Sequence, residues 1–292
     1  MDGQRILAEL DAITAEGSRD KVEEFLVEQS RLAEQEGDWG IQIMLNNEMM
    51  GFYRTTSQTK QAIKIFKRTK EIFMDHGLIG TVPYASTLQN AANAYRVDGQ
   101  LEEAIVLFEE ALEIYEKYLD PGDYRFAGLF NNLSLLYLEK GETWRAREFS
   151  EKALAIIEKL PDTTADQATN HVNLANLYCQ TGELSKAREH LVRAEELFEQ
   201  LDMQDPHISS LWSAWGQVHL ADNEPEEAEA DFMRAREEVE KYFGKSRPYA
   251  TVTRNLALAL ERQGKTDEAK EAMSEAEEVM KALGLEYYAH KL

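Results

Sequence analysis

The chain has 292 residues, 43% of them hydrophobic, and its 54 acidic and 32 basic side chains give a formal net charge of −22. So acidic a surface repels nucleic acid and anionic lipid, because binding either requires clustered Lys and Arg. These two classes of partner are therefore excluded, and a neutral or basic protein or peptide is expected. Solvation of the outer helix faces explains many of the acidic side chains equally well.

The cysteine content and the first residues bear on the compartment. Cys179 is the only cysteine, so an intramolecular disulfide is impossible. The opening Met1-Asp2-Gly3-Gln4-Arg5 lacks the basic and then apolar pattern of a secretory signal. No apolar run approaches the roughly 18 residues of a membrane span. We therefore expect a cytoplasmic protein.

Two amphipathic stretches open the chain, at about residues 3–16 and 18–36, and Gly17 separates them. Val22 and Leu26 stand roughly where a small and a large apolar residue stand in the later units. We interpret residues 1–40 as a capping helix pair, which is a degenerate copy of the repeat that follows.

A repeat of 41 or 42 residues occupies the rest of the chain, in six units at about 41–82, 83–124, 125–165, 166–206, 207–247 and 248–283. A small residue marks each unit: Ala62, Ala104, Ala146, Ala187, Ala228 and Ala269. Nine residues earlier stand Tyr53, Tyr95, Tyr137, Tyr178, His219 and Leu260, and turn residues lie between at Ser57, Gly99, Gly141, Gly182, Asn223 and Gly264. Such a period predicts a stacked repeat array, and no linker marks an internal domain boundary.

The second unit illustrates the pattern. Helix A is expected at about 85–97 and helix B at about 101–117, with Gly99 free to adopt a positive φ in the turn. Apolar residues of helix B recur at three- and four-residue spacing from Ala104 to Tyr115, which is typical of an amphipathic helix. Neither helix can bury its stripe alone, so the fold is predicted to be all-α, built from stacked antiparallel helix pairs.

These residues together resemble the tetratricopeptide repeat over about residues 41–283. The elements are the aromatic residue, the alanines of helix B, and a small residue three before the aromatic (Ala92, Ser134, Ala175, Gly216 and Ala257). The resemblance implies a right-handed superhelical α-solenoid that binds proteins or peptides in its concave groove. The usual repeat has 34 residues, and this longer variant looks like the repeats of kinesin light chain. Met50, Asn223 and Leu260 depart from the pattern.

Asparagine recurs inside helix A, five residues before the aromatic position, as Asn90, Asn132, Asn173 and Asn255. Asparagine is a poor helix former, and five residues turn the side chain about 140° away from the packed aromatic. Amides also stand three residues later (Asn93, Asn176 and Gln217) and one residue earlier (Asn131). The resemblance implies that this ladder holds a ligand backbone. Alternatively, the amides fix the stacking of neighbouring repeats.

Other side chains are candidates for the same groove. Arg54 and Arg96 occupy equivalent positions in adjacent units, where they would either hold a carboxylate of the ligand or pair with a nearby acid such as Glu48. Arg254 and Arg262 lie on or near the groove side at the other end. Trp212, with Trp215, His171 and Leu135, is a candidate for side-chain pockets.

Chemistry is not expected. The six histidines form no His-x-x-x-His pair and do not lie near the cysteine, and no glycine-rich phosphate loop is present. We therefore expect no metal, no cofactor and no enzymatic activity. The function indicated is an interaction scaffold or adaptor. The alternative is a peptide-responsive regulator that resembles bacterial pheromone receptors but lacks its own effector domain.

The C-terminal tail, residues 284–292, is short for a capping helix. Terminal repeats need a solvated outer side. Either the tail folds back as a short cap, or the last apolar face docks on a partner or on a second copy of the chain. Docking is favoured, and a homodimer through the C-terminal end face is one form of it.

Overall fold

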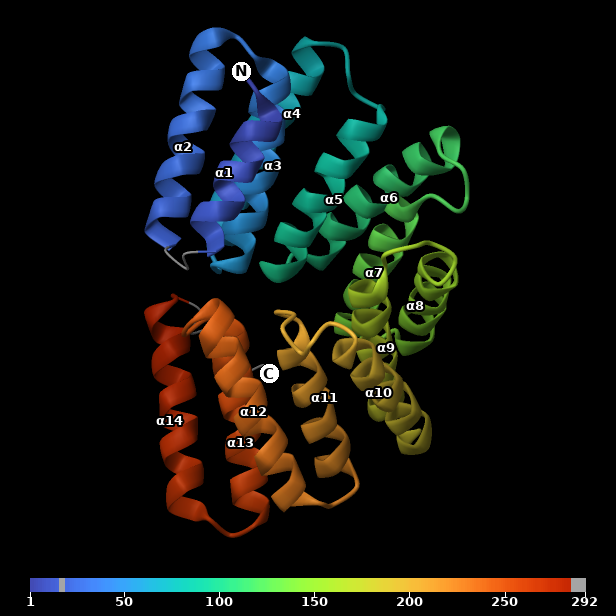
Figure 1. Cartoon of the computed structure of the whole chain (residues 1–292), viewed down its shortest axis with the longest axis vertical. Coiled ribbons are helices and arrows are strands. Elements are labelled where there is room, and N and C mark those ends of the chain that lie inside the picture. The colour runs from blue at the N-terminus through green and yellow to red at the C-terminus, as the bar shows by residue number, and fades with distance from the viewer. Residues whose placement is uncertain (16–18, 285–292) are drawn as a thin grey trace. The chain divides into compact units, whose positions relative to one another are not determined.

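The computed structural model describes residues 1–15 and 19–284 (Figure 1). Those residues form fourteen α-helices and no strand, which confirms the all-α prediction. The helices are α1 (Gly3–Ala15), α2 (Arg19–Glu36), α3 (Trp39–Thr55), α4 (Thr59–Asp75), α5 (Val82–Val97), α6 (Leu101–Tyr118), α7 (Tyr124–Glu139), α8 (Thr143–Ile157), α9 (Thr164–Gln180), α10 (Leu184–Glu199), α11 (Ile208–Ala221), α12 (Pro225–Phe243), α13 (Arg247–Arg262) and α14 (Thr266–Ala282).

The helix ends differ from the expected ones by a few residues. Helix α3 begins at Trp39, inside the range expected for the cap, and α5 begins at Val82, three residues before the expected start. The Pro at the second position of α5 explains the earlier start, because Pro is favourable in a first helical turn. Apart from Gly284, the predicted tail lies outside the described residues.

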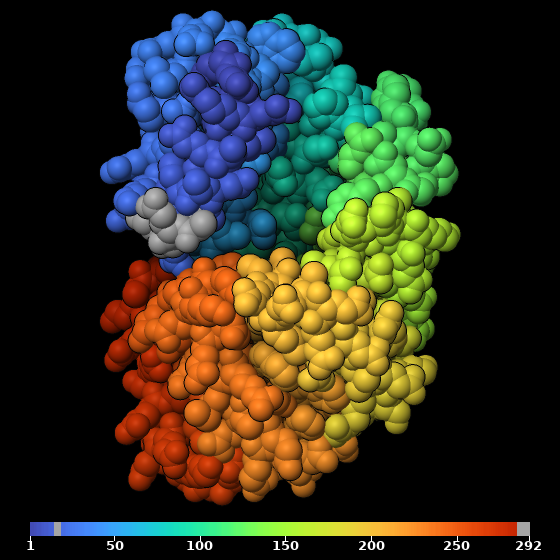
Figure 2. Space-filling model, in the orientation of Figure 1, coloured from blue at the N-terminus to red at the C-terminus, as the bar shows by residue number. Residues whose placement is uncertain are grey.

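The chain divides into two compact units, Met1–Pro121 with α1 to α6 and Gly122–Leu292 with α7 to α14. Figure 2 shows the units in space-filling form, the first from blue to green and the second from green to red. No linker or composition change in the sequence marks this division. The boundary falls between Pro121 and Gly122, two residues that are unfavourable inside a helix.

Within each unit the helices pack as successive pairs. In the first unit α3 contacts α4 and α5 contacts α6, and in the second the pairs are α7 with α8, α9 with α10, α11 with α12, and α13 with α14. The first helices of neighbouring pairs also touch, as α3 does α5, and as α9 does α11. The first helices therefore form a continuous layer inside each unit, and that layer carries the polar ladder.

Small residues set the distance between paired helices. Ala104, Ala146, Ala187 and Ala228 are fully buried in the second helix of their pairs. At Gly216 in α11 there is no room for a side chain, because a Cβ there would lie 2.7 Å from Cε1 of Phe232 on α12. Small residues that recur one repeat apart thus stand where paired helices meet.

Every pair turns through the same cap. Ser57, Gly99, Gly141, Gly182, Asn223 and Gly264 all have a positive φ, between 63° and 83°. The next residue donates its backbone N–H to the carbonyl five residues earlier, as Gln100 does to Tyr95 at 2.9 Å and Glu183 to Tyr178 at 2.9 Å. This is the Schellman arrangement, which satisfies the last carbonyls of the helix.

Gly216→Ala should lower the free energy of unfolding by about 1–3 kcal/mol, because the added methyl overlaps the ring of Phe232. Gly51→Ala is the matched control, since Gly51 is also helical but a Cβ there meets nothing within 4 Å. That variant should gain about 0.5–1 kcal/mol from helix propensity. Chemical denaturation measures both, and effects of the same sign would contradict the packing at Gly216.

Candidate functional site: the amide face of the first helices

Three amides of the predicted ladder lie in the second unit without a partner. Asn132 on α7, Asn173 on α9 and Asn255 on α13 are half-buried, and none makes a hydrogen bond with any described residue. Ala214 on α11 interrupts the row. A primary amide offers two donors and an acceptor, the same groups that a peptide backbone offers and needs. These side chains are therefore available for a ligand backbone.

Two other predicted amides are engaged in joining repeats. Asn90 Nδ2 donates to Asn47 Oδ1 at 3.1 Å, and Asn47 Nδ2 donates to Thr87 Oγ1 at 3.1 Å, which ties α3 to α5. Asn131 Oδ1 accepts from Asn170 Nδ2 at 2.5 Å, which ties α7 to α9. The alternative interpretation, stacking of neighbouring repeats, thus describes Asn90 and Asn131.

The position one turn further along the same face differs between the units. Asn93 is buried, and its Oδ1 accepts from Arg96 Nε at 3.4 Å. Asn176 Oδ1 is buried without a partner in the described part of the chain, and Gln217 is half-buried and unpaired there. An unsatisfied buried acceptor costs roughly 1–3 kcal/mol. A ligand N–H directed at Asn176 would remove that cost.

Trp212, which the sequence predicts for this face, has its contacts with the second helix of its own pair. The Trp212 ring lies under the Arg234 guanidinium at 5.0 Å from the ring centroid and packs against the core of the last repeats. Its position is two residues before the ladder position, about 200° around the helix, and therefore faces the second helix of its own pair. His171, at the equivalent position one repeat earlier, contacts His190 on α10 in the same way.

Two of the predicted arginines are poorly compensated. Arg54 forms no ion pair with a described residue, and burial together with the nearby Arg96 lowers the pKa of its guanidinium. The suggested Arg54–Glu48 pair is not formed among the described residues. Burial and the Asp11 carboxylate raise the pKa of Glu48. Arg254 Nε is buried without a partner, and burial lowers the pKa of this side chain.

A histidine pair between α9 and α10 was missed by the sequence analysis. The Nδ1 atoms of His171 and His190 are 2.8 Å apart, and the His190 ring stacks on Tyr178 at 5.3 Å between centroids. One repeat later His219 and Asp231 take the places of Tyr178 and His190 and bond at 2.7 Å. The sequence does contain a sign of these contacts. His190 and Asp231 each stand three residues after the recurring alanine of their unit, where the other units carry an apolar residue.

Comparison with known proteins identifies the family. A sequence profile described as tetratricopeptide repeat matches residues 83–159, 125–200 and 207–282, so the chain belongs to the tetratricopeptide repeat family. No curated protein sequence matches the chain.

Solved structures of similar fold include several Rap proteins. A Rap protein complexed with competence and sporulation factor is 17% identical over 99% of this chain and 79% of its own, with a TM-score of 0.75. Aspartyl phosphate phosphatase F from Bacillus subtilis is 16% identical over 94% and 68%, with a TM-score of 0.65. The Rap conjugation gene regulator of plasmid pLS20, solved with the Phr* peptide, is 13% identical over 83% and 75%, with a TM-score of 0.61. A putative kinesin light chain is also matched, at a TM-score of 0.39.

Acid should destabilise the protein partly through His171. Burial, then His190 and Arg193, lowers the pKa of His171 to about 4, against about 6.5 in an unfolded chain. Between these values the unfolded state binds a proton that the folded state does not, so stability falls as the pH decreases through this window, by about 3 kcal/mol.

His171→Gln should therefore flatten the dependence of the unfolding free energy on pH between 6.5 and 4. His207→Gln is the control, because the side chain of His207 is 60% exposed. Denaturation at several pH values compares both with the unmodified chain, and an unchanged slope in His171→Gln would exclude this assignment.

Proposed function

We propose that the protein is a non-catalytic adaptor that binds a peptide or a partner protein along the first helices of its second unit. Asn132, Asn173 and Asn255 would hold the ligand backbone, with Asn176 and Gln217 beside them. The observation that carries the proposal is that these amides have no partner among the described residues, whereas Asn90 and Asn131 are used to join repeats.

The amides alone supply limited affinity. Each neutral hydrogen bond contributes about 1 kcal/mol net, so three or four of them correspond to a dissociation constant near the millimolar range or weaker. Side-chain contacts must add the rest. The amides bind the ligand backbone and not its side chains. The side-chain contacts would therefore also determine which ligand is bound.

The similar structures support peptide binding. One Rap protein was solved with competence and sporulation factor and another with the Phr* peptide. We extend peptide binding to this chain on the strength of its own unpaired amides. The net charge of −22 favours a ligand that is neutral or basic overall, and the single cysteine suits the cytoplasm.

A peptide-responsive regulator is the alternative function. The same comparisons favour it, since one similar structure is described as a conjugation gene regulator and another as a phosphatase. In this case peptide binding would change the affinity for a second protein. Measuring the binding of a recovered partner with and without peptide separates a regulator from a simple adaptor.

The predicted homodimer has no support in α14. The large apolar side chains of this helix are buried or half-buried. On α13, which packs against α14, Leu258 is exposed. Residues 285–292, on which the prediction partly rested, lie outside the described residues. Dimerisation stays a prediction, and sedimentation at micromolar concentration tests it.

Replacing both Asn132 and Asn173 with Ala should weaken binding of the partner recovered from native lysate at least tenfold, about 1.4 kcal/mol. The melting temperature should stay within a few degrees, because neither amide has an internal partner. Calorimetric titration measures the affinity.

Asn131→Ala is the matched control, one residue away on the same helix. It removes the bond to Asn170, so it should lower the melting temperature while leaving the affinity within about twofold. The reverse pattern, with stability lost in the double variant and affinity lost in Asn131→Ala, would overturn the proposed function.

A further inference from the structure

The junction between the third and fourth repeats, inside the second unit, contains a half-open pocket. It lies between the start of α8 and the end of α9, away from the amide face, and its volume is about 560 Å³ including the open solvent at its mouth. Trp144, Arg147, Leu177 and Tyr178 contribute to its walls. Arg147 is the one charged residue that lines it.

At the next two junctions the position equivalent to Arg147 also carries a charged residue. One repeat later Arg188 Nη2 lies 2.8 Å from Asp222 Oδ2 and 2.7 Å from Glu224 Oε2. Another repeat later the charges are exchanged, and Glu229 Oε2 accepts from Gln263 at 2.6 Å and from Lys265 at 2.7 Å. Both junctions are therefore closed by direct charged hydrogen bonds.

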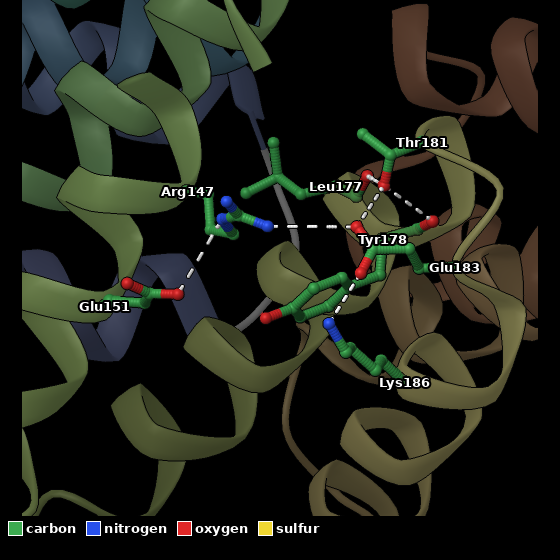
Figure 3. Close-up of polar contacts among 7 residues, drawn as sticks. All are labelled: Arg147, Glu151, Leu177, Tyr178, Thr181, Glu183 and Lys186. Carbon is green, nitrogen blue, oxygen red and sulfur yellow. Dashed lines mark hydrogen bonds and ion pairs between the residues drawn. The ribbon is translucent and has the colours of Figure 1, made fainter. Parts of the chain in front are cut away.

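At the junction between the third and fourth repeats, these hydrogen bonds are missing. Thr181 stands where the next repeat has Asp222, so one of the two carboxylates is absent. The other, Glu183, accepts from Lys186 Nζ at 2.6 Å and from the Thr181 hydroxyl at 3.1 Å (Figure 3). Both hydrogen bonds lower the pKa of Glu183, so its charge is already compensated.

Arg147 is consequently left with loose contacts. Its Nη1 is 3.8 Å from Glu183 Oε1 and its Nε is 3.9 Å from Glu151 Oε1, as the dashed lines in Figure 3 show. Both distances exceed a hydrogen bond. The guanidinium makes no hydrogen bond with a described residue, and 43% of the side chain is exposed.

An exposed aromatic residue stands beside this arginine. Trp144 is 63% exposed, although no such residue occurs at its position in the other repeats, which carry Lys60, Glu102, Ser185, Glu226 and Asp267. Five polar residues out of six show that this position faces solvent. Trp144 thus presents a large apolar surface to water next to a guanidinium that makes two long ion pairs but no hydrogen bond with a described residue.

We propose that this junction is a second binding site, separate from the amide face, for a peptide segment that carries one carboxylate next to a large apolar side chain. Arg147 donates two parallel hydrogen bonds to the carboxylate, and the apolar side chain packs on the Trp144 indole. Glu151 and Glu183 already lie 3.9 Å and 3.8 Å from the guanidinium, so a doubly charged phosphate is repelled more strongly than a carboxylate. The carboxylate of the bound segment thus takes the place that the Asp222 carboxylate occupies one repeat later.

The test uses the full chain and two acetylated and amidated hexapeptides, labelled with a fluorophore, whose cores are Phe-Asp and Asp-Phe in a Gly/Ser background. Fluorescence anisotropy should show binding of at least one of them. The same peptide with Asn in place of Asp, or Ala in place of Phe, should bind at least tenfold more weakly. Equal binding of the Asp and Asn peptides, or no binding of either core, would overturn the proposal.

The repeats themselves supply the protein variants. Thr181→Asp restores the carboxylate found at the next junction, so it should close the site and weaken peptide binding at least tenfold. Trp144→Ser installs the residue of the next repeat at an exposed position and should weaken binding as strongly. Asp222→Thr removes one of the two carboxylates bonded to Arg188 and leaves Glu224. Because Ser185 stands there in place of the tryptophan, this variant should add no binding.

Undiminished binding by Thr181→Asp and Trp144→Ser would exclude this pocket. The Asn132→Ala and Asn173→Ala double variant should bind these peptides as the unmodified chain does, because the amide face is not involved. Loss of binding in the double variant alone would assign the peptides to the amide face instead, and would contradict the second site without contradicting the proposed function.

Discussion

The close crossing of paired helices is the constraint on which the rest of the structure depends. At Gly216 the ring of Phe232 occupies the space that a methyl group would need. In four other pairs a buried small residue stands at the equivalent position: Ala92, Ser134, Ala175 and Ala257. Two helices this close still leave their outer stripes uncovered, so each pair is stable only against its neighbours. The small residues thus bring two helices into close pairs, and these pairs must stack to bury their outer apolar stripes. Stacking in turn aligns the first helices in one layer.

A constant register makes the repeats comparable with one another. Each turn places a positive φ at the same position, and each cap bonds back to the carbonyl of the aromatic position. Equivalent positions of successive repeats consequently face equivalent positions of the next repeat. Departures then carry information. With Thr181 in place of an aspartate, Arg147 has only ion pairs of 3.8 and 3.9 Å, whereas Arg188 one repeat later is hydrogen-bonded to two carboxylates.

Polar groups inside such an array divide between joining repeats and facing outward, and one residue of sequence separates the two roles. Asn131 accepts a hydrogen bond from the next repeat, whereas the adjacent Asn132 has no partner. Successive helical residues point about 100° apart, so one amide meets the neighbouring helix and the next does not. The His171 side chain points in a third direction, toward α10, where it contacts His190.

The sequence by itself determined the repeats, the helix pairs and the turns, because alanine and aromatic spacing and turn residues such as Gly99 are local signals that recur six times. Tertiary structure alone decided which amides join repeats, and it placed Trp212 against Arg234. It also set the boundary after Pro121. The physical reason is that periodicity gives the direction of a side chain around its own helix, whereas its partner depends on how closely the neighbouring helices approach.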